Sequence, residues 1–178
     1  MNISYTTAST SEELLQILSL QRMNLKSAIS IEEMQHEGFV TVEHDFELLK
    51  RMNDYCPHII AKDNEIVIAY ALSMTEDFKD EISVLRPMFN ELDANHIQNF
   101  LTMGQICIAK THRKMGVFKG LYSAMKRFSY PKYEYIITEV DATNTRSLNA
   151  HLAAGFEKLC TYHSLGQDWE LISLKTSS

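Results

Sequence analysis

One stretch of strand, turn and helix constrains the fold of this chain more than any other feature. An apolar run predicts a strand over about 103–110, a basic turn follows at 111–116, and apolar residues at helical spacing predict a helix over about 116–128. Such a turn presents free backbone N–H groups at a helix N-terminus, where an anion binds well. Three basic residues flank it, namely Arg113, Lys114 and Lys119. We therefore expect a phosphate-bearing ligand at this turn.

A second strand and helix follow directly. Residues 133–140 read as a strand, and Asn144 begins a short helix that ends at Gly155, a typical helix-ending glycine. Strand, helix, strand and helix in succession predict two adjacent parallel strands joined by a right-handed crossover. The helix at 116–128 is expected to bury Val117, Leu121 and Met125, with Phe118 and Tyr122 on an adjoining face.

The N-terminal part predicts one strand and two helices. Residues 2–7 alternate weakly as a strand, and Thr10 with Glu13 forms a capping box for a helix over about 12–26. Gly38 interrupts the pattern, and Thr41 is expected to cap a second helix. That helix contains Phe46, Leu48, Leu49 and Met52 and ends before Pro57.

The remaining segments predict antiparallel strands and one irregular connection. Residues 58–74 read as a hairpin whose turn lies at 62–65, because Asp-Asn favours a turn between β-branched runs. Residues 77–98, which include Pro87, predict a loop with a short helix. Two closing strands are expected near 157–164 and 168–174. The expected fold class is α/β with a mixed α+β sheet of about seven strands, helices on both faces and a single domain over 1–178.

Composition narrows the class of function. The chain has 178 residues, 45% of them hydrophobic and 22% charged, which is typical of a globular protein with a core. A formal net charge of −6 argues against nucleic acid as a partner, and no apolar run is long enough for a membrane span. The first residues lack the features of a secretory signal. Three widely spaced cysteines suggest a reducing cytoplasm, and seven histidines without metal-binding spacing suggest no metal.

Two motifs resemble a known family. Residues 113–121, Arg-Lys-Met-Gly-Val-Phe-Lys-Gly-Leu, resemble the acetyl-CoA signature of the GNAT superfamily of N-acetyltransferases, an Arg/Gln-x-x-Gly-x-Gly/Ala pattern on a strand-to-helix turn. Residues 144–156 resemble the family's second signature, in which Asn, a small residue and usually Tyr precede Gly-Phe. The resemblance is close over 99–165 and extends to the N-terminal half only in the order of elements. It implies a GNAT-like acyl-CoA N-acyltransferase fold and acetyl-CoA as co-substrate.

The resemblance also implies roles for residues at matching positions. The backbone at Ile106, Ile108 and Lys110 would pair with the pantetheine amides like an added strand, and backbone N–H groups of 113–119 would hold the pyrophosphate. Asn144 would bind the pantetheine arm or cap its helix. The implied acetyl-CoA contacts are Ile106, Ile108, Ala109, Lys110, Arg113, Lys114, Gly116, Val117, Phe118, Lys119, Gly120, Leu121, Asn144, Ser147 and His151.

The sequence departs from the family pattern at two positions. Phe118 stands where the family prefers Gly or Ala, so its side chain must point away from the phosphates or the cofactor must shift. His151 stands where the family usually has the Tyr that protonates the leaving thiolate. His151 could donate that proton only with a raised pKa or through a water, and it could instead pack beside the cofactor. Tyr122 and Tyr162 are alternative donors.

Acetyl transfer to an amine also needs a base, because an alkyl amine is protonated at neutral pH. Glu139 is the leading candidate, since a carboxylate inside an apolar strand is costly without a function or a partner. Its alternative is structural, as an acceptor for a neighbouring backbone group or Arg146. Gln105 could orient a water that acts as base, or it could be a satisfied buried amide.

The expected function is transfer of an acetyl group from acetyl-CoA to a primary amine of a small molecule or peptide, by direct attack. Backbone donors at 106–108 would hold the thioester carbonyl. The alternatives are a different acyl-CoA as donor and an acyl-CoA-binding sensor without turnover. The acidic residues Glu76, Asp77, Asp80 and Glu81 either form a solvated loop or attract a cationic amine. The acceptor is left open, as is the assembly, with a homodimer as one alternative.

Overall fold

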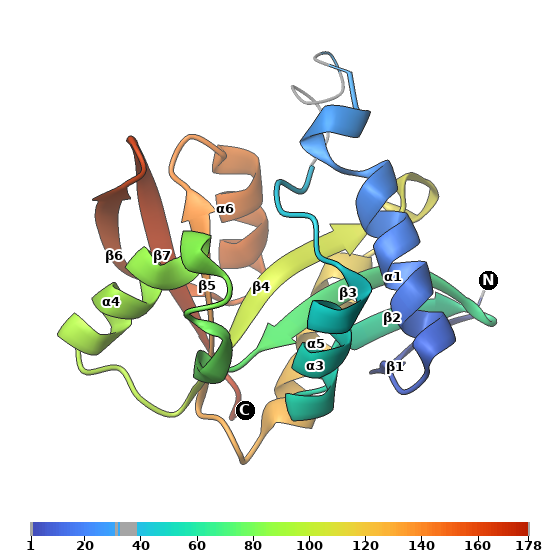
Figure 1. The fold of residues 1–178 in the computed structure, drawn as a ribbon, viewed down its shortest axis with the longest axis horizontal. Helices are drawn as coiled ribbons and strands as arrows, with labels where there is room; N and C mark the ends of the chain where they lie inside the picture. Colours follow the sequence, from blue (N-terminus) through green and yellow to red (C-terminus); the bar gives the residue numbers. More distant parts are fainter. Residues whose placement is uncertain (1, 31, 33–38, 178) are drawn as a thin grey trace. The chain divides into compact units, whose positions relative to one another are not determined.

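The computed structural model describes residues 2–30, 32 and 39–177, and its elements follow the order expected from the sequence (Figure 1). The strands are β1 (Ile3–Thr7), β2 (Ile59–Asp63), β3 (Ile66–Met74), β4 (Phe100–Ile108), β5 (Tyr135–Asp141), β6 (Glu157–Ser164) and β7 (Gln167–Lys175). The α-helices are α1 (Ser11–Met23), α3 (Phe46–Tyr55), α4 (Arg86–Ala94), α5 (Val117–Ser129) and α6 (Thr145–Ala153). Gly38 lies outside the described residues.

The strands form a seven-stranded mixed sheet in the order β1-β2-β3-β4-β5-β7-β6. β4 and β5 are parallel, as the succession of strand and helix predicted, while β1–β2, β2–β3, β5–β7 and β6–β7 are antiparallel. The predicted fold class is therefore confirmed. By their contacts the residues group into two compact units. The first comprises Met1–Ser73 and Gly104–Met125, and the second Met74–Met103 and Lys126–Ser178. A single domain over 1–178 stays a prediction.

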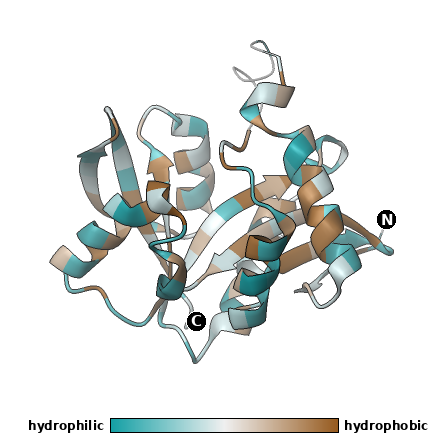
Figure 2. Ribbon diagram, viewed as in Figure 1, coloured by the Kyte–Doolittle hydropathy of each residue, from teal (hydrophilic) through white to brown (hydrophobic). Residues whose placement is uncertain are grey.

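In the first unit, helices cover both faces of the strands. Ile60 pairs with Tyr70, and both belong to a buried cluster to which α1 contributes Leu14 and Ile17. On the other face of these strands, β1 contributes Tyr5. The Tyr5 ring packs so closely on Gly120 of α5 that a Cβ atom at position 120 would collide with it. Because successive strand residues point to opposite faces, α1 and α5 lie on opposite sides. Figure 2 shows the hydrophobic residues concentrated along these strands.

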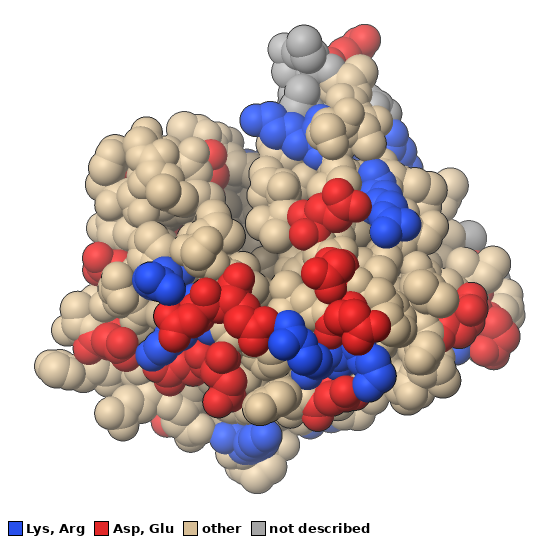
Figure 3. Space-filling view, viewed as in Figure 1, with Lys and Arg blue, Asp and Glu red and all other residues tan. Residues whose placement is uncertain are grey.

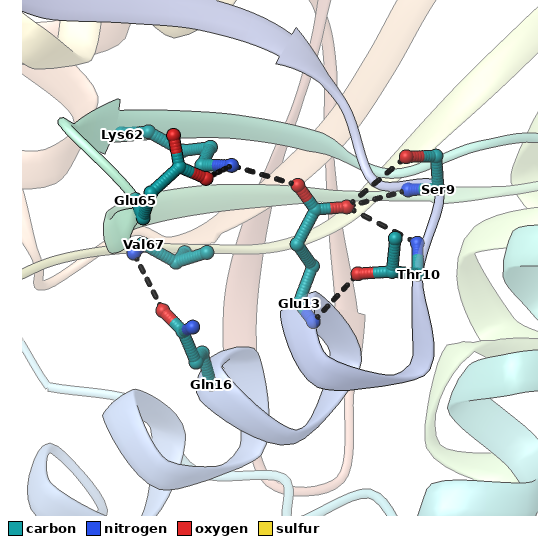
Figure 4. A network of polar contacts seen from close by, with 7 residues as sticks. All are labelled: Ser9, Thr10, Glu13, Gln16, Lys62, Glu65 and Val67. Atoms are coloured by element: carbon teal, nitrogen blue, oxygen red, sulfur yellow. Dashed lines mark hydrogen bonds and ion pairs between the residues drawn. The ribbon is translucent and has the colours of Figure 1, made fainter.

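The N-terminal turn of α1 is fastened to the β2–β3 hairpin (Figure 4). Glu13 accepts hydrogen bonds from the backbone N–H groups of Ser9 and Thr10, and the Thr10 hydroxyl accepts from the Glu13 N–H, so the predicted capping box is confirmed. The other carboxylate oxygen of Glu13 accepts from Lys62 Nζ at 3.1 Å. Burial raises the pKa of Glu13, but these hydrogen bonds outweigh it and hold the pKa below its ordinary value.

Two predicted boundaries were wrong, and local hydrogen bonds explain both. The second helix is capped by Asp45 rather than Thr41, because the Asp45 carboxylate accepts from the Leu48 N–H at 2.8 Å. α1 ends at Met23, and the Asn24 side chain donates to the Leu20 carbonyl at 2.8 Å. The short helix predicted within 77–98 is confirmed as α4, with Pro87 in its first turn.

In the second unit, helices again lie on both faces. Phe100 pairs with Tyr135, and the Phe100 ring lies 6.2 Å from the Phe89 ring of α4. The opposite face carries Leu174, which lies 3.5 Å from the Cβ position of Gly155 at the end of α6. α4 and α6 therefore cover opposite faces of these strands. Among the described residues, no helix combines the length and apolarity required to cross a bilayer.

A buried histidine joins α3 to β3. His58 is 0% exposed, and its ring accepts a hydrogen bond from the Ser73 N–H at 3.1 Å. The other ring nitrogen lies 3.1 Å from the Leu49 carbonyl of α3, which can only accept, so that nitrogen carries the hydrogen. Burial lowers the pKa of His58 to about 4, so the ring is neutral at physiological pH.

We expect this histidine to make the fold sensitive to acid. Its pKa is about 4 in the folded state and near 6.5 when exposed, so the unfolded chain binds its proton first and stability falls as pH drops from 6.5 towards 4. His58→Gln removes this proton uptake. As the pH falls from 6.5 to 4, its unfolding free energy should therefore rise by up to about 3 kcal/mol relative to that of the wild type. Denaturant unfolding at several pH values measures this. The exposed His163→Gln is the control, and an equal rise there would contradict the assignment.

Candidate functional site

The turn between β4 and α5 presents a run of backbone N–H groups. A short 3-10 helix at Lys110–His112 follows β4, and then Lys114 (φ 63°) and Gly116 (φ 78°) adopt left-handed conformations. Over the residues described, five backbone N–H groups here donate to no protein acceptor, those of Lys114, Met115, Gly116, Val117 and Lys119. Successive N–H groups in such a turn, at the positive end of a helix, form an anion-binding concavity. The geometry therefore fits the anion site expected from the sequence.

Arg113 shapes this turn through its side chain. Its Nε donates to the Ile108 carbonyl at the end of β4 at 3.1 Å, and its Nη2 donates to Asn24 Oδ1 at the end of α1 at 2.7 Å. The guanidinium is thus engaged with the protein, and only the backbone of Arg113 lies in the turn. Lys114 and Lys119 are exposed and provide the positive charge beside the unbonded N–H groups.

Three of the α5 residues that the family resemblance implies as acetyl-CoA contacts are packed against the rest of the protein. The Val117 and Leu121 side chains are buried in the core, and Gly120 lies against the Tyr5 ring, so these residues present only backbone to a ligand. Phe118 is half-buried, and its ring meets that of Tyr122 edge-on at 5.1 Å. Since Tyr122 lies one turn further into the helix, this contact supports the alternative in which Phe118 points away from the anion site.

The end of β4 offers backbone groups beyond its pairing with β5. That parallel pairing extends over Phe100–Thr102 and Tyr135–Ile137. Ile106 and Ile108 are half-buried residues of the later part of β4. The Ala109 N–H donates to the Ile68 carbonyl of β3 at 2.8 Å, so that group is already used. Of the implied pantetheine contacts on this strand, Ile106 and Ile108 lie beyond the pairing with β5, and the Ile108 carbonyl already accepts from Arg113 Nε.

Gln105 is a buried amide with several protein partners. Its Oε1 accepts from Gln21 Nε2 at 2.8 Å and from the Tyr70 hydroxyl at 2.6 Å, and its Nε2 donates to the Val42 carbonyl at 2.8 Å. Gln21 also accepts from the His44 N–H at 2.9 Å. This network ties residues 42–44 to α1 and β4. It favours the structural alternative for Gln105 over the orientation of a catalytic water.

His151 is buried in α6, where it is 2% exposed. Its Nδ1 lies 2.8 Å from the Ser147 carbonyl, which can only accept, so Nδ1 carries the hydrogen. Burial lowers the pKa of His151 to about 4, the opposite direction from the one that proton donation to a thiolate requires. Asn144 caps the same helix, with Oδ1 accepting from the Ser147 N–H at 3.0 Å, which supports the second of its two expected roles.

Glu139 on β5 has a partner that the sequence did not indicate. The Tyr162 hydroxyl of β6 donates a hydrogen bond to Glu139 Oε2. Burial is the larger effect on the pKa of Glu139, and the hydrogen bond from Tyr162 acts in the opposite direction. The resulting pKa is raised to about 7. Burial and the hydrogen bond to Glu139 raise the pKa of Tyr162 far above 10. The sequence had suggested a neighbouring backbone group or Arg146 as a structural partner of Glu139. The observed partner instead lies across β7, which stands between β5 and β6.

The Glu139–Tyr162 pair can carry acid–base chemistry. A carboxyl group with a pKa of about 7 is poised to take up or release a proton at neutral pH, which is the condition for an efficient general base. Such a shift at a specific partner is also typical of functional sites. The second unit therefore contains a titratable pair, and the first contains the anion site.

The acidic loop at 76–81 is less suited to attract a cationic amine than its composition suggests. In the acidic loop, Glu76 pairs with Lys79 at 2.8 Å and Asp80 pairs with Arg86 at 3.0 Å, so much of its charge is compensated. Figure 3 shows acidic and basic side chains intermixed on the face in view. Over the described ranges, no group of three or more His, Cys, Asp or Glu could hold a metal ion.

Neither a protein-family model nor a curated protein matches the sequence, whereas several solved structures match the fold. The ribosomal-protein-S18-alanine N-acetyltransferase from Escherichia coli has a TM-score of 0.66 at 11% identity, over 99% of this chain and 96% of that one. An N-acetyltransferase from Staphylococcus aureus has 0.65 at 14%, over 99% and 100%. A GNAT superfamily phosphinothricin acetyltransferase from Sinorhizobium meliloti, in complex with acetyl-CoA, has 0.62 at 16%, over 98% and 89%. The chain has the GNAT fold.

We expect Glu139 to make stability fall with rising pH. Its pKa is about 7 when folded and 4.5 ordinarily, so the stability that its neutral form provides is complete below pH 4.5 and is lost as pH rises through 7. Glu139→Gln keeps an acceptor for Tyr162 and cannot ionise, so its unfolding free energy relative to the wild type should increase between pH 4.5 and 8. Denaturant unfolding across this range measures the difference. The exposed Glu157→Gln should show no such trend, and a flat difference for Glu139→Gln would refute the raised pKa.

Proposed function

We propose that this chain, which has the fold of the GNAT acetyltransferases, transfers an acetyl group from acetyl-CoA to a primary amine of a small molecule or peptide. The observation that carries the proposal is the left-handed turn at Lys114 and Gly116, whose unbonded N–H groups open α5 within the segment that resembles the acetyl-CoA signature. A structure with this fold was solved with acetyl-CoA bound.

The residues of the first unit fit the demands of acetyl-CoA. The backbone N–H groups of Lys114, Met115, Gly116, Val117 and Lys119 would receive the pyrophosphate, with the exposed Lys114 and Lys119 ammonium groups beside it. The backbone of Ile106 and Ile108 would pair with the pantetheine amides. Bound acetyl-CoA supplies an activated thioester. The protein's own part is then to hold it and to manage protons.

Glu139 is the base in this proposal. A primary amine has a pKa near 10, so it must lose a proton before it can attack. Raising the pKa of Glu139 from 4.5 to about 7 makes that transfer easier by roughly 3 kcal/mol. The Tyr162 hydroxyl holds the carboxylate in place. The neutral amine then attacks the thioester carbonyl directly, without an acyl-enzyme.

The same pair can return the proton to the leaving thiolate. A thiol has a pKa of about 8.5, above that of Glu139, so a proton on Glu139 passes to the thiolate downhill. His151 carries its hydrogen on Nδ1, which is engaged with Ser147, and its pKa is about 4. We therefore assign the acid to the Glu139–Tyr162 pair and a packing role to His151. A sensor that binds acyl-CoA without turnover is the second candidate, favoured by the absence of Tyr at position 151.

We expect the purified chain to bind acetyl-CoA and to release free thiol when a suitable amine is added. Calorimetric titration measures the binding, and thiol release over a panel of diamines, amino acids, aminoglycosides and peptides measures turnover. Glu139→Gln should keep the acetyl-CoA affinity and lose about 100- to 10,000-fold in turnover, the usual contribution of a general base. Binding without thiol release for any amine would favour the sensor. Absence of binding would exclude both functions.

Two glycines with matching backbones test the anion site. Gly116 (φ 78°) and Gly166 (φ 79°) both have a left-handed conformation, and at each of them nothing lies within 4 Å of the position that a Cβ would take. Glutamate at either position costs about 1–2 kcal/mol of backbone strain. Only Gly116→Glu places a negative charge at the proposed pyrophosphate site, so it should weaken acetyl-CoA binding at least ten-fold. Gly166→Glu, in the β6–β7 turn, should leave binding unchanged, and equal affinities would show that the site is elsewhere.

A further inference from the structure

Thr102 on β4 has a buried hydroxyl that lacks a partner. The residue is 1% exposed, and within the described part of the chain its Oγ1 makes no hydrogen bond. Buried hydroxyl groups in folded proteins are nearly always hydrogen-bonded, so an orphaned one calls for an explanation such as a ligand. No motif or spacing in the chain had singled out this threonine.

Strand register places Thr102 on the same face as the Glu139–Tyr162 pair. Thr102 pairs with Ile137, and Glu139 is two residues further along β5, so both side chains point to one face. Glu139 pairs with Leu171 of β7, which pairs with Cys160, and Tyr162 is two residues further along β6. All of these residues belong to the second unit.

α4 covers this face. Phe100 is two residues before Thr102 and therefore shares its face, and its ring meets Phe89 of α4 at 6.2 Å. Thr102 is thus the next residue of β4 on this face after the one that meets α4.

The spacing on this face suits a bound nitrogen. Thr102 pairs with Ile137, where the pairing of β4 with β5 ends, and Glu139 lies roughly 7 Å further along β5 on the same face. A nitrogen bound between the two side chains can donate a hydrogen bond to each of them. The groups that act electrostatically on Tyr162 are Glu139, Glu91 of α4 and Cys160, none of them cationic. A protonated amine would therefore be attracted to this face.

We propose that the Thr102 hydroxyl and the Glu139–Tyr162 pair together form the subsite for the acceptor nitrogen of a primary amine. The inference rests on the proposed function and names the residue that orients the nucleophile. Thr102 accepts one N–H of the amine while Glu139 accepts the proton that must leave. Holding two N–H groups fixes the direction of the nitrogen lone pair, and a tertiary amine, which has at most one N–H, cannot be held in this way.

The test compares Thr102→Val with Thr102→Ser. Valine has nearly the same shape and lacks the hydroxyl, whereas serine keeps it. We expect Thr102→Val to lower kcat/KM for the amine at least ten-fold, mainly through KM, and to leave acetyl-CoA affinity unchanged. Its Tm should equal or exceed that of the wild type, because no protein hydrogen bond is lost and an unpaired buried hydroxyl is removed. Thr102→Ser should retain most of the wild-type kcat/KM.

Each other outcome has a definite meaning. Wild-type kcat/KM in Thr102→Val would overturn the subsite and leave the proposed function standing. A lower Tm in Thr102→Val, restored in Thr102→Ser, would show that the hydroxyl bonds within the protein and would equally overturn it. Absence of thiol release by the wild type with every amine would instead refute the proposed function, and the subsite with it.

Discussion

The structure of the candidate site depends on hydrogen bonds that the Arg113 side chain makes to two other elements. They join the end of β4, at the Ile108 carbonyl, to the end of α1, at Asn24. With both ends held, the chain can pass through left-handed conformations at Lys114 and Gly116 and enter α5 with the N–H groups of Val117 and Lys119 donating to no acceptor among the described residues. An unpaired N–H run is costly unless water or a ligand covers it. The arginine of the signature therefore maintains the binding geometry from outside the ligand contacts.

Features that depend on local sequence could be predicted. The capping box at Thr10 and Glu13, the left-handed end of α6 at Gly155 and the hairpin turn at Asn64 each require particular residue types within a few positions. The parallel pairing of β4 and β5 followed from the order of elements, because a strand–helix–strand unit permits little else. The cap of α3 was misassigned because Thr41 and Asp45 are both good caps, and tertiary contacts decide between them.

Features that depend on contacts across the sheet could not be predicted. Tyr162 reaches Glu139 over the intervening strand β7, and no spacing in the sequence encodes that approach. The orphaned hydroxyl of Thr102 is visible only once the surroundings of every polar atom are known. The role of Gln105 could not be decided from the sequence for the same reason. Its three hydrogen bonds join it to Gln21, Tyr70 and Val42, at sequence separations of 35 to 84 residues.

Burial decides which residue can handle protons in this fold. Removing a side chain from water disfavours its charged form, so the same effect acts in opposite directions on an acid and on a base. It raises the pKa of Glu139 towards neutrality and lowers the pKa of His151 away from it. A residue is useful for proton transfer only when both of its forms are accessible at the working pH. In the proposed mechanism, His in place of Tyr at position 151 is therefore compatible with turnover, because burial lowers the pKa of His151 and raises that of Glu139.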